Sequence, residues 1–229
     1  MLIGILQTGD APAPLRPTSG DYPDMFERLL AGRGFTFRTW RVLEMNFPAS
    51  PQEADGWLIT GSRFGAYEDH AFIPPLEDFI RAVQAAHVPM VGICFGHQII
   101  AQALGGRVEK FAGGWSVGPQ DYDFGDETVT LNAWHQDQVV ARPAGARVVA
   151  RSGFCENAAL AYGDSILTVQ AHPEFDEPVI RGLIEHRGSA VPAPLIAEAR
   201  HRLEAGEAAG RLSLANRIEE FFKRQHANA

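Results

Sequence analysis

Residues 88–106 read VPMVGICFGHQIIAQALGG, in which a cysteine stands between an apolar run and a segment of helix-forming residues. The apolar run, residues 88–93, predicts a buried strand. The segment from Gly96 to Gly106 predicts a helix, because a glycine pair at its end is typical of a glycine C-cap. Cys94 therefore lies at a sharp turn from strand to helix, which is the central unit of the predicted fold.

The chain on both sides of this turn alternates between strand and helix patterns. Between residues 107 and 170, short runs broken by Gly, Asp and Pro predict strands and hairpins. The alternation with one antiparallel excursion predicts an α/β fold, a doubly wound, mostly parallel sheet flanked by helices. Further strands are predicted at residues 2–7, 35–39 and 57–59, and further helices after Asp21, from Pro74 and after Pro178.

No repeat and no flexible linker divides the sequence, so we expect a single domain over residues 1–229, with residues 192–229 as a C-terminal helical extension. The spacing of apolar residues in this extension predicts a helix docked on the core, and the alternative is a helix that binds a partner or a second copy. The apolar residues are Leu212, Leu214, Ile218, Phe221 and Phe222.

The composition is that of an ordinary globular protein, with 45% hydrophobic and 21% charged residues. Its net charge of −8 comes from 20 Lys+Arg against 28 Asp+Glu, and the basic residues are scattered, which argues against nucleic acid as a partner. The first residues lack a basic leader, and no run of about 18 apolar residues occurs. We therefore expect a cytoplasmic protein with no membrane association.

The residues around Cys94 have the spacing of a nucleophile elbow. Gly92 and Gly96 each stand two residues from the cysteine, as in G-x-S-x-G hydrolases, where small residues allow a strained turn to present the nucleophile. At the start of a helix, the positive end of the dipole and the free N–H groups favour the thiolate, the reactive form of cysteine. The alternative for a lone cysteine is a small buried apolar residue, but such a residue needs no flanking glycines.

A second candidate cluster follows the apolar run SILTV, residues 165–169. His172 and Glu174 then lie at the carboxyl end of a strand, where open α/β sheets bind ligands. In extended chain they point to the same side, so the carboxylate can orient the imidazole while its other nitrogen takes a proton from Cys94. A turn whose histidine caps a helix is the alternative reading of this segment.

Three other readings of the histidines and cysteines are weaker. Cys94 and His97 form a C-x-x-H pair that His172 could join in binding zinc, but no second closely spaced cysteine and no H-E-x-x-H motif occurs. His135 is a rival general base, since it follows an apolar strand. Cys155 has no elbow around it and is expected to be a core residue. We expect neither a metal nor a cofactor.

Several separated motifs resemble those of the class I, triad-type glutamine amidotransferases, especially the amidotransferase domain of GMP synthase and the related γ-glutamyl peptidases. The resemblance spans most of the chain from residue 1 to about residue 186, and it implies a flavodoxin-like fold. The motifs are ITGS at 59–62, VGICFGHQ at 91–98, LGG at 104–106, GW at 114–115, WHQDQV at 134–139 and QAHPEF at 170–175.

This resemblance implies a catalytic triad of Cys94, His172 and Glu174. It also implies that backbone N–H groups of Gly61 and Phe95 form the oxyanion hole. The residues that it implies in binding the substrate are Gln98, Trp134 and His135, with Asp137 as a further candidate. The sequence departs from many relatives at the early glycine loop, where Gly61-Ser62 is followed by Arg63-Phe64, so Arg63 becomes a candidate for binding a substrate carboxylate.

The resemblance implies hydrolysis of the glutamine side-chain amide to glutamate and ammonia, through a γ-glutamyl thioester. No phosphate-binding motif is present, so a synthetase that used the ammonia would be a separate subunit. The alternative is a stand-alone hydrolase of γ-glutamyl peptides or amides, acting on a small-molecule substrate without a partner. A scaffold protein without activity is disfavoured because all three triad residues are present.

Overall fold

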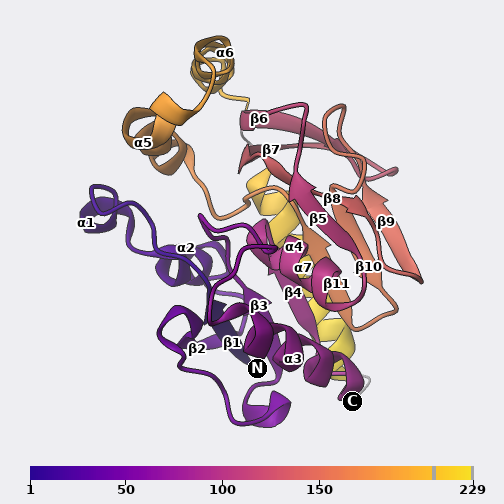
Figure 1. The fold of residues 1–229 in the computed structure, drawn as a ribbon. Helices are drawn as coiled ribbons and strands as arrows, with labels where there is room; N and C mark the ends of the chain where they lie inside the picture. The colour runs from indigo at the N-terminus through magenta and orange to yellow at the C-terminus, as the bar shows by residue number, and fades with distance from the viewer. Residues whose placement is uncertain (208–209, 228–229) are drawn as a thin grey trace.

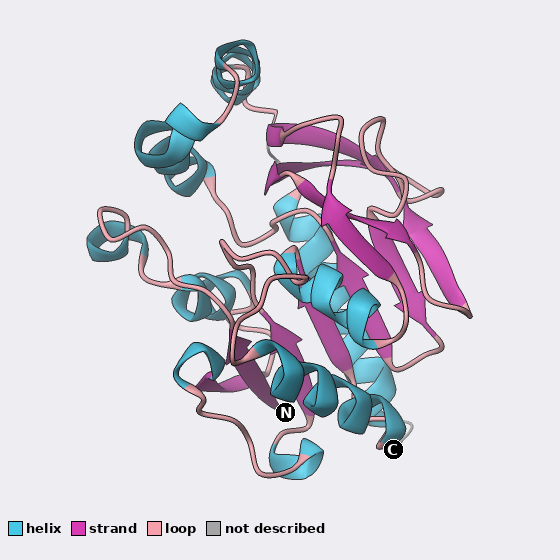
Figure 2. Ribbon diagram, viewed as in Figure 1, coloured by secondary structure: helices cyan, strands magenta, loops and turns pink. Residues whose placement is uncertain are grey.

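The structure is a computed structural model that describes residues 1–207 and 210–227, and its centre is a seven-stranded sheet (Figures 1 and 2). The first five strands in sheet order run parallel to their neighbours, and the last two are antiparallel. This arrangement confirms the predicted mostly parallel sheet. In sheet order the strands are β2 (Thr36–Arg41), β1 (Leu2–Gln7), β3 (Gly56–Ile59), β4 (Met90–Ile93), β11 (Ile166–Val169), β10 (Ala159–Tyr162) and β9 (Ala146–Ala150).

Helices cover both faces of the sheet, because successive side chains of each strand point to opposite sides. On one face, α3 (Ile73–Ala85) and α4 (Phe95–Ala103) pack on Leu6, Trp57 and Met90. On the other face, α2 (Tyr22–Leu29) and α7 (Arg211–Ala227) pack on Ile3, Leu58 and Val91. The centre of the sheet is therefore buried on both sides, which agrees with the short, fully buried strands β3 and β4, whereas the edge strand β2 is partly exposed.

Two of the predicted helices begin or end at the capping residues that the sequence indicated. Asp21 caps α2 and forms a capping box with Asp24. Helix α4 ends at Ala103, Leu104 is its C-cap residue, and Gly105 follows with φ 93°, so the predicted glycine at the end of this helix is present. The remaining helical segments are α1 (Arg16–Ser19), α5 (Glu177–Arg187), α6 (Ala193–Glu204), η1 (Val42–Glu44), η2 (Pro51–Glu53) and η3 (Gly188–Ala190).

The antiparallel excursion consists of two hydrogen-bonded strand pairs beside the main sheet. Strand β5 (Arg107–Lys110) pairs with β8 (Asp137–Ala141), and β6 (Ser116–Asp123) pairs with β7 (Thr128–His135). Helix α6 packs on β6, where a Cβ added to Gly118 would lie 2.5 Å from Cβ of Ala199. The excursion brings the segment after β7 to the carboxyl end of the parallel strands.

The predicted docking of the C-terminal helix on the core is confirmed for α7. Leu214, Ile218 and Phe222 are fully buried against the sheet, whereas Leu212 is 59% exposed. Residues 208–209 and 228–229 of the predicted extension lie outside the described residues. Within the part of the chain that the structure describes, no helix is long and apolar enough to cross a membrane.

Candidate active site

Cys94 occupies the turn between β4 and α4 in a conformation that ordinary residues avoid. Its φ of 52° and ψ of −101° make it one of three non-glycine residues with positive φ in the described chain. A Cβ on Gly92 would lie 2.5 Å from the carbonyl oxygen of Gly96, and one on Gly96 would lie 2.4 Å from that of Ile59. Both glycines are therefore required by close backbone approaches, as the elbow pattern predicted.

The order of the strands brings three distant loops to one edge of the sheet. Strand β4 lies between β3 and β11, and all three are parallel. Their carboxyl ends therefore place Gly61, Cys94 and His172 together. A Cβ added to Gly61 would lie 2.9 Å from Cε1 of His172 and 3.8 Å from Cβ of Cys94.

His172 and Glu174 form a buried hydrogen bond, with 2.7 Å between Nδ1 and Oε1. The expected extended chain is wrong: His172-Pro173-Glu174 forms a turn, in which the N–H of Phe175 approaches the carbonyl of His172 at 3.4 Å. The proline and this turn fold the carboxylate back toward the ring. The imidazole also stacks on Phe175, with 4.0 Å between ring centroids and an interplanar angle of 4°.

Charge keeps the imidazole protonated in spite of its burial. Burial alone would lower the pKa of His172. The negative charges of Cys94 and Glu174, and their hydrogen bonds to the ring, outweigh this effect and raise the pKa to about 10. The His172 ring is therefore an imidazolium at neutral pH, next to the sulfur of Cys94. Oε2 of Glu174 is buried without a hydrogen-bond partner among the described residues, so the carboxylate is held through a single oxygen.

The two residues whose N–H groups are expected in the oxyanion hole lie beside this cluster, Gly61 near His172 and Phe95 next to Cys94 in the chain. Among the described residues, none accepts a hydrogen bond from the N–H of Gly61 or of Phe95. Phe95 is the first residue of α4, where N–H groups have no partner within the helix. Within the described residues, neither N–H group is therefore committed to another acceptor.

A pocket of about 540 Å³ opens over Cys94 and His172, and the expected substrate-binding residues Gln98, Trp134 and His135 line it. Nε2 of Gln98 donates to the carbonyl of Asp137 at 2.9 Å and to Oε1 of Gln170 at 3.1 Å. These bonds fix the Gln98 amide and leave its carbonyl oxygen as the atom that can accept from a ligand.

His135 differs from His172 in its charge. Burial lowers the pKa of His135 to about 4, so the ring is neutral at physiological pH. Its Nδ1 lies 3.2 Å from the carbonyl of Asp137, and Nε2 is buried without a partner among the described residues. Cys94 is a hydrogen-bonding and charge partner of His172, which disfavours His135 as the general base.

The remaining cysteine and the suggested zinc ligand lie in other surroundings. Nδ1 of His97 hydrogen-bonds Oγ1 of Thr168 at 2.8 Å, and burial lowers the pKa of His97 to about 3. Cys155 is 1% exposed, and burial raises the pKa of its thiol to about 12, as expected for a core residue. The described ranges 1–207 and 210–227 contain no cluster of three or more His, Cys, Asp or Glu side chains suited to a metal.

Comparison with known proteins agrees with this geometry. Residues 24–179 match the family described as glutamine amidotransferase class-I. The chain belongs to this family. The γ-glutamyl peptidase 4 of Arabidopsis thaliana is 30% identical over 187 residues, 74% of each chain. A subunit of the glutamine-hydrolyzing GMP synthase from Sulfolobus acidocaldarius is 40% identical over 102 residues, which cover 40% of this chain and 54% of the relative.

Solved structures support the fold of this class I amidotransferase. A glutamine amidotransferase from Methylobacillus flagellatus superposes with a TM-score of 0.73 at 22% identity, covering 100% of this chain and 94% of the other. One from Thermotoga maritima has the same TM-score at 20% identity and covers 98% of each chain. At these identities the likeness concerns the fold alone.

Three residues of the candidate site were not predicted from the sequence. The N–H of His172 donates to the carbonyl of Asn132 at 2.8 Å, and Nδ2 of Asn132 donates to the carbonyl of Phe175 at 2.9 Å, so Asn132 fixes the turn from both ends. Tyr22 and Arg187 line the pocket from α2 and α5. Asn132 could have been recognised as a polar residue between apolar neighbours in β7. Nothing in the neighbouring sequence marks Tyr22 or Arg187 as a site residue.

Proposed function

We propose that the protein is a cysteine amidohydrolase that cleaves γ-glutamyl amide bonds, of which the side-chain amide of glutamine is the simplest. Cys94 is the nucleophile, His172 the general acid and base, and Glu174 the residue that orients the ring. The N–H groups of Gly61 and Phe95 bind the oxyanion, while Gln98, Trp134 and His135 contact the γ-glutamyl group. The whole chain acts as one catalytic domain with a helical extension.

The reaction proceeds through a γ-glutamyl thioester. The Cys94 thiolate attacks the δ-carbonyl carbon, and the carbonyl electron pair moves to the oxygen held by the two N–H groups. As the C–N bond breaks, the His172 imidazolium gives its proton to the departing nitrogen. The neutral ring then takes a proton from water, the resulting hydroxide opens the thioester, and glutamate leaves with the thiolate and imidazolium restored.

The observation that carries this proposal is the Cys94 elbow beside the buried His172–Glu174 pair at one edge of the sheet. The similarity to a γ-glutamyl peptidase supports the choice of substrate class. The proposed nucleophile and substrate class are tested together by treatment with a glutamine-like alkylating analogue, followed by mass spectrometry. We expect a single label on Cys94. Cys155→Ala serves as the matched control and retains the label, whereas Cys94→Ala loses both label and turnover. Wild-type turnover by Cys94→Ala would refute the proposal.

The similarity to a subunit of GMP synthase supports a second candidate, a glutaminase that supplies ammonia to a separate synthetase. Assays of glutamine against γ-glutamyl dipeptides, with and without cell extract, separate the two functions. Glutaminase activity that rises strongly only with extract favours the glutaminase that serves a synthetase. Hydrolysis of γ-glutamyl dipeptides by the purified protein alone favours the stand-alone hydrolase.

A further inference from the structure

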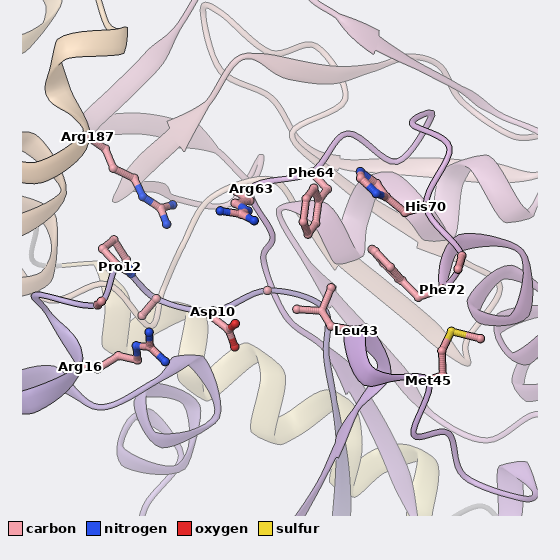
Figure 3. Close-up of a pocket in the computed structure, with 14 residues that line it drawn as sticks. Asp10, Pro12, Arg16, Leu43, Met45, Arg63, Phe64, His70, Phe72 and Arg187 are labelled. Carbon is pink, nitrogen blue, oxygen red and sulfur yellow. The ribbon is translucent and has the colours of Figure 1, made fainter.

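A second pocket of about 530 Å³ adjoins the candidate active site (Figure 3). Arg63, Phe64 and Arg187 line both pockets, so they stand between Cys94 and the second pocket. A substrate whose scissile bond lies at Cys94 can therefore extend past these residues. The second pocket can then hold the end of such a substrate that lies beyond Arg63 and Arg187.

One side of this second pocket is positively charged. Figure 3 shows the guanidinium groups of Arg16, Arg63 and Arg187 around the same space as the Asp10 carboxylate. Within the described chain, none of these three arginines has an ion pair, whereas Asp10 already binds Arg41 at 3.2 Å. Unneutralised arginines in a protein with a net charge of −8 mark a local site for an anion.

The other side of the pocket is apolar and aromatic. Phe64 packs on His70 with 4.2 Å between ring centroids and on Phe72 with 6.0 Å. Leu43 and Met45 complete this wall, and Met45 is 53% exposed. A ligand that filled the pocket would bring an anionic group to the arginines and an apolar group to the rings.

Resting on the proposed function, we propose that Arg63 and Arg187 determine specificity by binding a carboxylate on the leaving group. The preferred substrate class is then a γ-glutamyl amino acid or peptide with a free carboxylate and an apolar side chain. A guanidinium binds a carboxylate through two parallel N–H···O bonds, which suits this role. Ammonia, the leaving group of glutamine, makes neither contact.

The test compares hydrolysis of γ-glutamylphenylalanine with that of γ-glutamylphenethylamide, which lacks the carboxylate. We expect wild-type kcat/KM to favour the first substrate by roughly tenfold or more, because charge-assisted hydrogen bonds would hold its carboxylate. Solvent around the exposed Arg63 weakens its share of this preference. The preference should shrink as ionic strength rises. Arg63→Gln and Arg187→Gln should each reduce this preference, because each should raise KM more for γ-glutamylphenylalanine than for the phenethylamide.

Arg142→Gln is the matched control, since Arg142 is exposed and lines neither pocket. It should leave the preference unchanged. Equal hydrolysis of both substrates by the wild type and the arginine variants would overturn the inference and leave the proposed function standing. If neither substrate is cleaved, calorimetry with the Cys94→Ala protein measures the binding of both compounds. Tighter binding of γ-glutamylphenylalanine than of the phenethylamide, abolished by Arg187→Gln, supports the anion site. Equal binding of both compounds overturns it.

Discussion

Replacing Gly61 with alanine tests whether the observed position of His172 is required for turnover. The added Cβ would lie 2.9 Å from Cε1 of the imidazole, where ordinary contacts begin at 3.4 Å, so the ring must move by about half an ångström. The ring cannot move freely, because it stacks on Phe175 and hydrogen-bonds Glu174. A misplacement of about 1 Å can cost about 100-fold in rate, so half of it predicts a loss of roughly tenfold in kcat/KM.

The assay is steady-state release of glutamate from glutamine and from a γ-glutamyl dipeptide. Gly153→Ala is the matched control, since no atom lies within 4 Å of its added Cβ and its φ is not positive. We expect the control to retain wild-type kcat/KM, and thermal melting to show that both variants are folded. A folded Gly61→Ala protein with wild-type kcat/KM would refute the reasoning, because His172 would then tolerate displacement.

Three further outcomes are expected. Glu174→Gln removes a charge-assisted hydrogen bond worth about 1.5–3 kcal/mol, so kcat/KM should fall roughly tenfold to a hundredfold, with more activity left than in Cys94→Ala. The pKa of His172 is raised to about 10, so the ring keeps its proton at pH values below its ordinary pKa of 6.5 and loses it above about pH 10. The rate of hydrolysis should therefore fall above about pH 10. In Glu174→Gln, which lacks the carboxylate charge, the rate should fall at a lower pH. Phe222→Ala, which empties a fully buried site, should lower the free energy of unfolding by about 3–5 kcal/mol in urea titrations, whereas Leu212→Ala, 59% exposed, should change it by less than about 0.5 kcal/mol. Wild-type kcat/KM in Glu174→Gln, the same pH profile in both proteins, or equal free energies of unfolding for Phe222→Ala and Leu212→Ala would contradict these predictions.

The centre of the sheet could be predicted from sequence because β3 and β4 are short apolar runs followed by polar or glycine-rich turns. The order of the strands could not be predicted from local pattern. Strand β11 follows β4 in the chain only after the whole antiparallel excursion, yet the two are neighbours, with Val169 paired to Ile93. That pairing, which depends on burial across the complete fold, brings His172 to Cys94.

Sequence patterns located Cys94, His172 and Glu174 because each depends on local chemistry: a pair of glycines for the elbow, and a strand end for the other two. The geometry of the turn at Pro173 was wrong in the prediction, since an extended chain and a turn can both bring a carboxylate to the ring. Tyr22 and Arg187 could not be found from sequence. They reach the pocket through the packing of α2 and α5, and neither has a distinctive neighbour in the chain.

This difference between strands and surrounding segments has a physical consequence for substrate choice. The elements that hold Cys94 and His172 are buried strands, whose backbone positions are fixed by pairing on both sides. Arg16, Arg63 and Arg187 belong to a short helix, a loop and the end of α5, all outside the sheet. Substitutions at these arginines can therefore change the charge offered to the leaving group without moving the nucleophile. On the proposed function, substitution of Arg63 or Arg187 should therefore lower kcat/KM more for a substrate whose leaving group has a carboxylate than for one whose leaving group has none.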